Sequence, residues 1–310
     1  MKMRVAKIRS EPGDVRVFEL RHPRRPTLPS FEAGAHVDVH LPDGRVRQYS
    51  LFGDPQDRSQ YLIAVKREAG GRGGSNWLHE HVVAGQELPV SAPRNHFGLS
   101  VEASSHILMA GGIGITPMLA MARSLYAGKR HFELHYFARS RSLAPLLGEI
   151  GRCLPAGGIH LHFDDEPATR ADIHALLAER RDHAHLYYCG PPGFMDAIRA
   201  AATAWHDDHV HYEAFQRADD GSHVASPFSV KLRSTGQVLE VPADATALAV
   251  LRAVGIPLSA SCENGVCGTC ECGYLDGEPI HLDAVLGPAA RVNRFIPCVS
   301  RAKGQLTLDF

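Results

Sequence analysis

The hydrophobic and polar residues follow three different patterns along the chain. In residues 1–101, apolar and polar positions alternate, as in Val37-Asp38-Val39, and turn sequences such as Leu41-Pro42-Asp43-Gly44 separate the alternating runs. Alternation with a period of two is typical of strands that are buried on one face. Many short strands with dense turns predict a small antiparallel barrel, interrupted by one helix with Ser75 as its N-cap.

In residues 102–216 the pattern changes to short apolar runs that alternate with helical stretches. The expected strands are at 107–110, 132–137, 159–163 and 185–189, and the expected helices at 117–126, 172–180 and 193–205. Alternation of strands and helices predicts a parallel sheet that is covered by helices.

A polar stretch at residues 217–226 is the expected linker to a third domain, residues 227–310. Two apolar runs flank Ser234-Thr235-Gly236, which is a hairpin signal. A short helix is expected at residues 244–254, closed by Gly255.

Cysteines are concentrated in this third domain. Cys262, Cys267 and Cys270 have the spacing C-x4-C-x2-C, and Cys298 follows after a gap. This is the spacing of the thiolate ligands of a plant-type [2Fe–2S] cluster. The sequence therefore predicts that these four cysteines hold such a cluster and that the protein transfers electrons.

Other uses of the cysteines fit less well. The C-x4-C-x2-C spacing disfavours a zinc site. Disulfides are disfavoured because the chain has seven cysteines, an odd number, and its first residues lack the apolar core of a signal peptide. Cys272 lies outside the spacing pattern and is expected to be a small buried residue.

Two turns of the second domain have residues that suit a ligand crevice. Gly111-Gly112-Ile113-Gly114-Ile115-Thr116-Pro117 follows an expected strand and opens an expected helix, where glycine lets the backbone approach a pyrophosphate. A close helix–strand contact would also explain this turn alone. Tyr188-Cys189-Gly190-Pro191-Pro192-Gly193-Phe194 ends a later strand of the same sheet. Ligands bind at the carboxyl ends of parallel strands, so both turns indicate one crevice.

Three segments of the first domain could bind a planar ring that carries a phosphate. They are Arg47-Gln48-Tyr49-Ser50-Leu51, Val65-Lys66-Arg67-Glu68 and Gly71-Arg72-Gly73-Gly74-Ser75. The tyrosine offers a flat surface, the serine a hydrogen bond, and the basic side chains with the helix start a phosphate cradle. Each segment alone has a simpler explanation as core or solvated charge, but their order favours a binding site.

Composition and charge exclude several classes of function. Hydrophobic residues make up 44% of the chain and charged residues 22%, which is typical of a soluble globular protein. The net charge of −1 argues against general nucleic-acid binding. The longest apolar stretch, residues 107–122, is broken by glycines and Pro117, so no membrane span is expected and the protein is expected in the cytoplasm.

Nineteen histidines raise the question of a metal site. Several occur two residues apart, as at His79/His81, His160/His162 and His209/His211, which in a strand places both on one face. No complete set of cysteine or carboxylate partners accompanies them in the sequence. Solvated or hydrogen-bonded histidine is therefore the expectation.

Together these segments resemble the phthalate dioxygenase reductase family, a fusion of flavin, NAD and ferredoxin domains related to ferredoxin-NADP reductases. The resemblance covers essentially the full length and includes Tyr212-Glu213-Ala214-Phe215. It implies a multidomain protein with an FMN-binding antiparallel β-barrel (1–101), an NAD-binding α/β domain with a parallel sheet (102–216), a linker (217–226) and an α+β β-grasp ferredoxin domain (227–310).

The resemblance also implies how the cofactors are held. Arg47, Tyr49 and Ser50 would contact the isoalloxazine, the segment from Lys66 to Ser75 its ribityl phosphate, and Phe215 the ring face. Ser50, Thr116 and Cys189 are the residues expected to assist hydride transfer. The expected cofactor-binding residues are Arg47, Gln48, Tyr49, Ser50, Ala64, Val65, Lys66, Arg67, Gly73, Gly74, Ser75, Gly112, Gly114, Thr116, Arg139, Ser140, Asp165, Cys189, Gly190, Pro191 and Phe215.

The implied reaction is hydride transfer from NADH to FMN, then single-electron transfer to the cluster and on to a protein partner. Asp164-Asp165 would repel the 2′-phosphate of NADPH, whereas Arg139-Ser140-Arg141 would attract it. We expect the two acidic residues to have the larger effect, so that the protein prefers NADH. The expected partner is the terminal oxygenase of a Rieske-type system, and the expected oligomeric state is a monomer. Alternatives are a reductase for another acceptor, such as a diiron oxygenase, or a non-enzymatic redox sensor or electron carrier.

Overall fold

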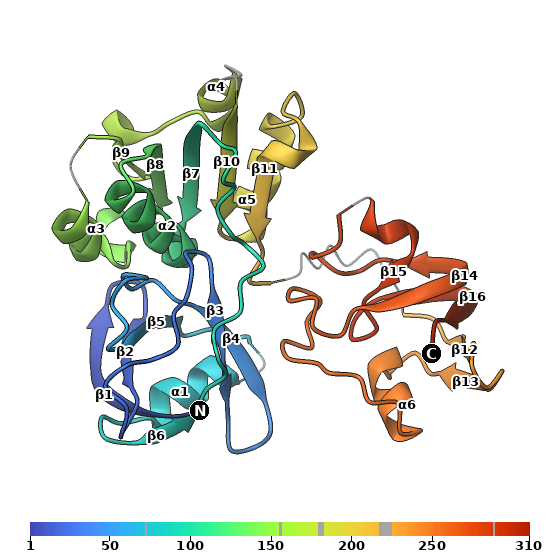
Figure 1. Ribbon diagram of the computed structural model, residues 1–310. Coiled ribbons are helices and arrows are strands. Elements are labelled where there is room, and N and C mark those ends of the chain that lie inside the picture. Colours follow the sequence, from blue (N-terminus) through green and yellow to red (C-terminus); the bar gives the residue numbers. More distant parts are fainter. Residues whose placement is uncertain (72, 155–156, 179–182, 217–224, 288) are drawn as a thin grey trace. The chain divides into compact units, whose positions relative to one another are not determined.

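The computed structural model describes residues 1–71, 73–154, 157–178, 183–216, 225–287 and 289–310. It divides into two compact units, Met1–Glu213 and Ala214–Phe310 (Figure 1). The first unit contains the predicted barrel and parallel sheet, and the second contains the cysteine-rich domain. Most of the predicted linker, residues 217–224, lies outside the described residues.

The barrel consists of two antiparallel sheets, with strand orders β5-β2-β1-β6 and β3-β4. Isolated bridges from Val39 to Val90 and from Leu51 to Ile63 connect the two sheets. The strands are β1 (Lys2–Glu11), β2 (Val15–Arg21), β3 (His36–His40), β4 (Val46–Ser50), β5 (Tyr61–Lys66) and β6 (Glu87–Pro89).

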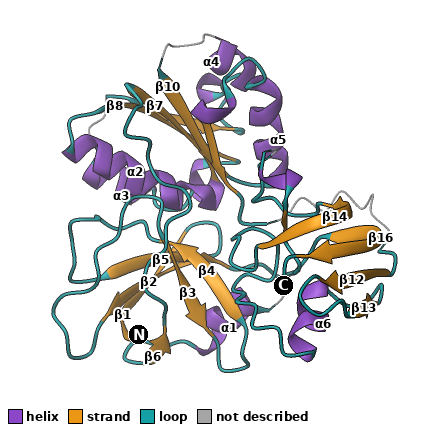
Figure 2. Ribbon diagram, turned by 45° about the vertical axis from the view of Figure 1, so that its right-hand side comes forward, coloured by secondary structure: helices purple, strands orange, loops and turns teal. Residues whose placement is uncertain are grey.

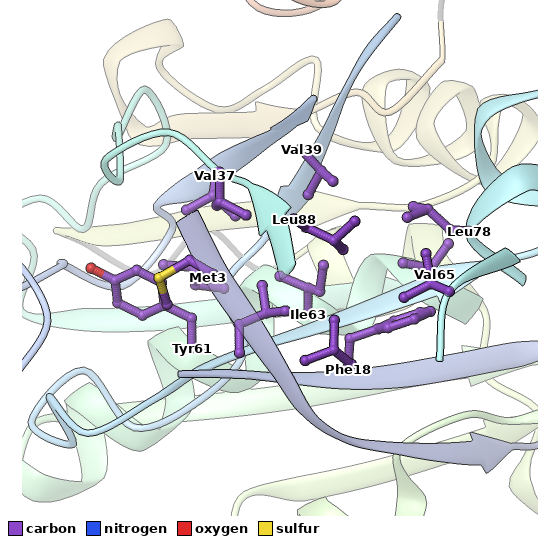
Figure 3. Packing of buried hydrophobic residues seen from close by; sticks show 14 of the residues in the cluster. Met3, Phe18, Val37, Val39, Tyr61, Ile63, Val65, Leu78 and Leu88 are labelled. Carbon is purple, nitrogen blue, oxygen red and sulfur yellow. The ribbon is translucent and has the colours of Figure 1, made fainter. Parts of the chain in front are cut away.

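The alternating apolar residues of these strands form the barrel core. Figure 3 shows Phe18 of β2, Val37 and Val39 of β3 and Ile63 of β5 gathered into one cluster. Leu78 of helix α1 (Gly74–His81) closes the cluster at one side and is 1% exposed. Burial of these side chains is the main favourable contribution to the folding of the barrel.

Helix α1 does not begin as the sequence predicts. Its N-cap is Gly73, which has a left-handed φ of 76° that favours glycine, and its first residue is Gly74. The hydroxyl of Ser75 instead accepts a hydrogen bond from the backbone N–H of Glu68 at 3.1 Å. The prediction of Ser75 as N-cap is therefore wrong.

The second half of the first unit is a five-stranded parallel sheet of order β11-β10-β7-β8-β9. Helices α2 and α3 lie on one face and α4 and α5 on the other (Figure 2). The elements are β7 (Ser105–Gly111), α2 (Ile115–Ala127), β8 (His131–Ala138), α3 (Leu147–Cys153), β9 (Ile159–Phe163), α4 (Ile173–Ala178), β10 (Ala184–Cys189), α5 (Pro192–Ala201) and β11 (Val210–Glu213).

Helix α3 was not predicted. Gly148 and Gly151 weaken its helical pattern, and its N-cap Leu146 has a left-handed φ of 63°. Tertiary contacts stabilise it, because Glu149 forms ion pairs with Arg9 of β1 at 2.6 Å and with Arg123 of α2 at 2.9 Å. These contacts also join the barrel to the parallel sheet.

The second unit is a mixed sheet of order β13-β12-β16-β14-β15 with helix α6 (Ala247–Ala253). Thr246 caps the helix by accepting a hydrogen bond from the N–H of Ala249. The strands are β12 (Phe228–Leu232), β13 (Val238–Val241), β14 (Cys272–Ile280), β15 (Arg294–Phe295) and β16 (Arg301–Leu308). Among all described residues, no helix combines the length and apolar composition that a membrane span requires.

Candidate functional site

The two predicted turns lie side by side in the first unit. They follow β7 and β10, which are neighbours in the sheet, although the chain leaves β7 for β8 on the opposite side. This is the topological switch point at which open α/β sheets bind ligands. A Cβ atom on Gly114 would lie 2.1 Å from the carbonyl oxygen of Cys189, so only glycine allows this approach. The two predicted turns therefore lie together at the place where such sheets bind ligands, and the crevice itself stays a prediction.

The glycine turn leaves room at its outer side. Gly112 has a left-handed φ of 53°, and a Cβ atom there would meet no atom within 4 Å. Thr116 is buried and its hydroxyl donates a hydrogen bond to the carbonyl of Ile113 at 3.1 Å, which fixes the first turn of α2. Gly190 and Pro191 pack against the same turn, where a Cβ on Gly111 would meet Pro191 and Phe194. The turn can accept a pyrophosphate against its backbone.

A half-buried carboxylate lies beside the second of these turns. Glu213 pairs in register with Cys189 at the carboxyl ends of β11 and β10. The hydroxyl of Ser50 in the barrel donates a hydrogen bond to Oε2 of Glu213 at 3.0 Å. Burial raises the pKa of Glu213 to about 7, and burial together with the Glu213 charge raises the pKa of the Cys189 thiol. Cys189 is therefore a neutral thiol, and Glu213 can exchange a proton near neutral pH.

The four residues predicted from β4 divide between its two faces. Arg47 and Tyr49 share one face, where Tyr49 packs on the barrel core and burial raises the pKa of its hydroxyl. Gln48 and Ser50 share the other face. The amide of Gln48 donates a hydrogen bond to Asp38 at 3.1 Å, so Gln48 anchors β4 to β3.

The start of α1 forms a basic cradle. A Cβ atom on Gly73 would lie 2.5 Å from a guanidinium nitrogen of Arg45, and one on Gly74 would lie 2.4 Å from Nε of Arg47. Two guanidinium groups thus lie against the backbone at a helix N-terminus, where N–H groups have no partner within the helix. This arrangement fits the phosphate of FMN, and Ser75 lies beside it in the first turn.

Other residues predicted for the flavin have different surroundings. Ala64 and Val65 are buried in β5. Lys66 forms an ion pair with Glu68 at 2.8 Å, and Arg67 forms one with Glu80. Both ion pairs are exposed, so their contribution to stability is small and a phosphate could compete for the cations.

The predicted nucleotide-specificity residues follow β8 and β9. Asp165 is exposed, and its N–H donates to the carbonyl of Arg139 at 3.2 Å, which joins the two segments. Ser140 contacts Ser142 through their hydroxyls at 3.0 Å. Arg141 donates two hydrogen bonds to the carboxylate of Glu166, both at 3.1 Å. Two donors of the Arg141 guanidinium group are therefore already used by the Glu166 carboxylate.

The four predicted cluster ligands come together in the second unit. Hydrogen-bond contacts between thiols join Cys262 to Cys267 and to Cys298, and join Cys270 to Cys298. Contacts from Cys267 and Cys298 lower the pKa of the Cys262 thiol, which favours the thiolate that binds iron. Four adjacent, buried sulfur atoms fit a [2Fe–2S] cluster.

The cysteine loop aims backbone N–H groups at these sulfurs. The N–H of Asn264 contacts Sγ of Cys262 at 3.3 Å, and that of Thr269 contacts Sγ of Cys267 at 3.5 Å. Gly265 allows the turn, because its φ is 71° and a Cβ atom would lie 2.5 Å from Val299. Hydrogen bonds to the sulfurs are one of the ways by which a protein sets a cluster's reduction potential.

Cys272 lies apart from this group. It packs in the main core of the sheet, and its sulfur lies 3.7 Å from the carbonyl oxygen of Phe295. Burial raises the pKa of its thiol to about 12, which suits a small buried residue.

Comparisons with known proteins agree with this assembly. Residues 230–303 match the family described as a 2Fe-2S iron-sulfur cluster binding domain. The chain is 46% identical over 288 residues to a vanillate O-demethylase oxidoreductase of a Pseudomonas species (strain HR199), with 91% of each chain covered. It is 40% identical over 306 residues to the heme-dependent oxidative N-demethylase beta subunit of Ectopseudomonas mendocina (strain ymp), covering 98% of this chain and 96% of the other.

Phthalate dioxygenase reductase of Burkholderia cepacia is 38% identical over 312 residues, covering 100% of this chain and 97% of the other. The solved structure of a phthalate dioxygenase reductase superimposes with a TM-score of 0.77, at 37% identity, and covers 100% of this chain and 98% of that one. The chain belongs to this family of oxygenase reductases. The predicted family, fold and oxidoreductase class are confirmed, as is a reductase that uses NADH, FMN and a [2Fe–2S] cluster.

Two residues of the site were missed by the sequence analysis. Glu213 was noted only as part of the segment 212–215, and Arg45 not at all. A glutamate at a strand end gives no sign of burial in the sequence, because the barrel residue that covers it, Ser50, is 163 positions away. The roles proposed for the individual site residues stay predictions.

The cluster assignment predicts opposite results for two cysteine variants. Cys298→Ser should lose the visible absorption of the cluster and its iron, because it removes one of four adjacent sulfurs. Cys272→Ser should keep both, because this side chain lies in the sheet core. Absorption spectra and iron analysis of the purified variants measure this, and the reverse result would overturn the ligand set.

The raised pKa of Glu213 makes the stability of the first unit depend on pH. A glutamate in the unfolded chain has a pKa of about 4.3, whereas the folded value is about 7. The contribution of Glu213 to the free energy of unfolding is complete below the pKa of the unfolded state and is lost as the pH rises through the pKa of the folded state. Relative to Glu213→Gln, the wild-type protein should lose about 3 kcal/mol of unfolding free energy between pH 5 and pH 8.

Denaturant titrations followed by tryptophan fluorescence measure this difference, because both tryptophans, Trp77 and Trp205, lie in the first unit. Glu87→Gln, at an exposed glutamate of β6, is the matched control and should show no such pH dependence. A difference between wild type and Glu213→Gln that does not vary with pH would show that Glu213 is ionised throughout this range.

Proposed function

We propose that this chain is the reductase of a Rieske-type oxygenase system that acts on an aromatic acid or a similar compound. The observation that carries the proposal is the occurrence, in one chain, of two adjacent glycine turns at a switch point, two guanidinium groups at a helix start and four adjacent thiols. The similarity to reductase components named for vanillate and phthalate supports the class of substrate. We further propose that it acts as a monomer in the cytoplasm.

The chain's own residues would position the reactants. When bound, FMN would supply the chemistry of hydride transfer and the cluster that of single-electron transfer. The Gly112 turn and Gly190 would hold the nucleotide's pyrophosphate, and Arg47 with the start of α1 would hold the flavin phosphate. Ser50, Thr116 and Cys189 would meet the reacting rings, with Glu213 fixing the hydroxyl of Ser50 from below.

The preference for NADH over NADPH is proposed on electrostatic grounds. Asp165 is an exposed carboxylate at the end of β9, where it would accept hydrogen bonds from a ribose and repel a 2′-phosphate. Arg141 is the cation best suited to that phosphate, but Glu166 already pairs with it in a bidentate geometry. The pair therefore makes Arg141 less attractive to a phosphate.

A second acceptor class has one specific observation in its favour. One relative at 40% identity is named as the beta subunit of a heme-dependent N-demethylase, so a haem protein is a competing electron acceptor. Rieske-type components are favoured because two relatives are named for vanillate and phthalate systems. The reduced protein, mixed separately with a Rieske-type and a haem-containing oxygenase component, should reduce the Rieske centre faster, and faster haem reduction would favour the second class.

Anaerobic titration with NADH tests the internal electron path. Absorbance of the flavin and of the cluster should both decrease on addition of NADH, because the two sites belong to one chain. A decrease of the flavin signal alone would show that the cluster is not coupled to it. No response to NADH or NADPH would contradict the reductase and restore the sensor or carrier alternative.

Two variants test the proposed nucleotide preference. Asp165→Ala should lower the ratio of kcat/KM for NADH to that for NADPH by about tenfold, since one charge–phosphate repulsion of about 1.4 kcal/mol is removed. Glu166→Gln should shift the ratio in the same direction by releasing Arg141. Asp54→Asn, an exposed aspartate of the barrel, is the control. An unchanged ratio in both variants would remove these residues from the explanation.

A further inference from the structure

Three potential metal ligands lie on the β8–β9 edge of the parallel sheet. Glu133 and His135 of β8 and His160 of β9 offer one ligand atom each, and these atoms all lie within 4.8 Å of one another. Strand register places His135 directly opposite His160. Glu133 precedes His135 by two positions and so shares its face. The sequence indicates the histidine pair His160/His162, but it does not indicate that Glu133 of β8 lies near it.

Hydrogen bonds through His162 fix the tautomer of His135. Nδ1 of His162 lies 2.8 Å from the backbone carbonyl of Thr169, and a carbonyl can only accept. Neutral His162 therefore donates from Nδ1 and accepts at Nε2. That Nε2 lies 3.1 Å from Nδ1 of His135, which must be the donor. The lone pair of neutral His135 is consequently on Nε2.

Nε2 of His135 faces Oε2 of Glu133 at 3.6 Å. Two acceptors that face one another repel unless a proton or a metal ion lies between them. In the neutral tautomer that the hydrogen bonds to His162 fix, no proton of His135 lies between these two atoms. Neutral imidazole is also the form that binds metal.

We propose that Glu133, His135 and His160 bind one divalent transition-metal ion of the zinc class. Two imidazole nitrogens and one carboxylate oxygen suit zinc, with a water molecule in the fourth position. Ligand atoms of a tetrahedral zinc ion lie about 3.4 Å apart, so the group has to contract. The ring of His160 now stacks on that of His135 with centroids 4.6 Å apart, and because His160 is exposed it can turn out of this stack to make the adjustment. His162 and Thr169 orient the ring of His135 without binding the ion.

Zinc binding by the full-length protein with its cofactors tests the site. Equilibrium dialysis against Zn²⁺ should show one bound ion per chain, with iron content and cluster absorbance unchanged. Glu133→Gln and His160→Gln should each weaken binding at least about tenfold. Glu133→Gln is a conservative test of the site, because its amide can donate to Nε2 of His135 and preserve the local contact.

His211→Gln is the matched control. Nε2 of His211 lies 2.8 Å from Nδ1 of His185, a similar histidine pair, but strand register places it on the opposite face of the sheet. This variant should bind zinc as the wild type does. The proposal is overturned if no zinc binds to the folded protein, if binding survives in both site variants, or if His211→Gln loses it equally.

Discussion

The backbone contact between the ends of β7 and β10 is the constraint on which the nucleotide-binding region depends. Gly114 allows the turn after β7 to touch the carbonyl of Cys189, where any side chain would be 2.1 Å from that oxygen. The contact brings the glycine turn against Gly190 at the switch point of the sheet. The register of β11 with β10 places Glu213 next to the same Cys189, where Ser50 of the barrel donates a hydrogen bond to it. The glycine turn and the carboxylate thus meet at the end of β10.

Electrostatics explain how the chain can hold a carboxylate at this place. Burial makes ionised Glu213 unfavourable, and the hydroxyl of Ser50 only partly compensates by donating to it. By contrast, Glu149 at the other contact between barrel and sheet is kept ionised, because Arg9, Arg123 and Arg152 outweigh its burial and lower its pKa. The carboxylate of Glu213 is suited to proton exchange, and that of Glu149 is suited to joining the barrel to the parallel sheet.

The sequence predicted the layers, the strands and the cofactor motifs because these depend on local periodicity and on spacing. Alternation in β3 and the C-x4-C-x2-C spacing need no knowledge of distant residues. The errors and omissions concern features set by tertiary contacts. Ser75 has the chemistry of an N-cap, but Gly73 takes that position because the backbone there has a left-handed φ of 76°, which favours glycine. Helix α3 forms despite two glycines because Glu149 meets arginines from other elements.

The difference between local and tertiary information also explains why the sequence does not reveal the proposed metal site of β8 and β9. Two histidines that are two positions apart in a strand share a face, but the sequence does not show which residues of the neighbouring strand lie opposite them. Register adds His135 opposite His160, and the carbonyl of Thr169 then determines, through His162, which nitrogen of His135 keeps its lone pair. The cysteine loop needs no such tertiary information, because its turns place the N–H groups of Asn264 and Thr269 against the nearby sulfurs. A metal site with three of its four ligands in one loop can therefore be recognised from spacing, whereas one spread over a sheet becomes visible only when strand register and hydrogen-bond direction are known.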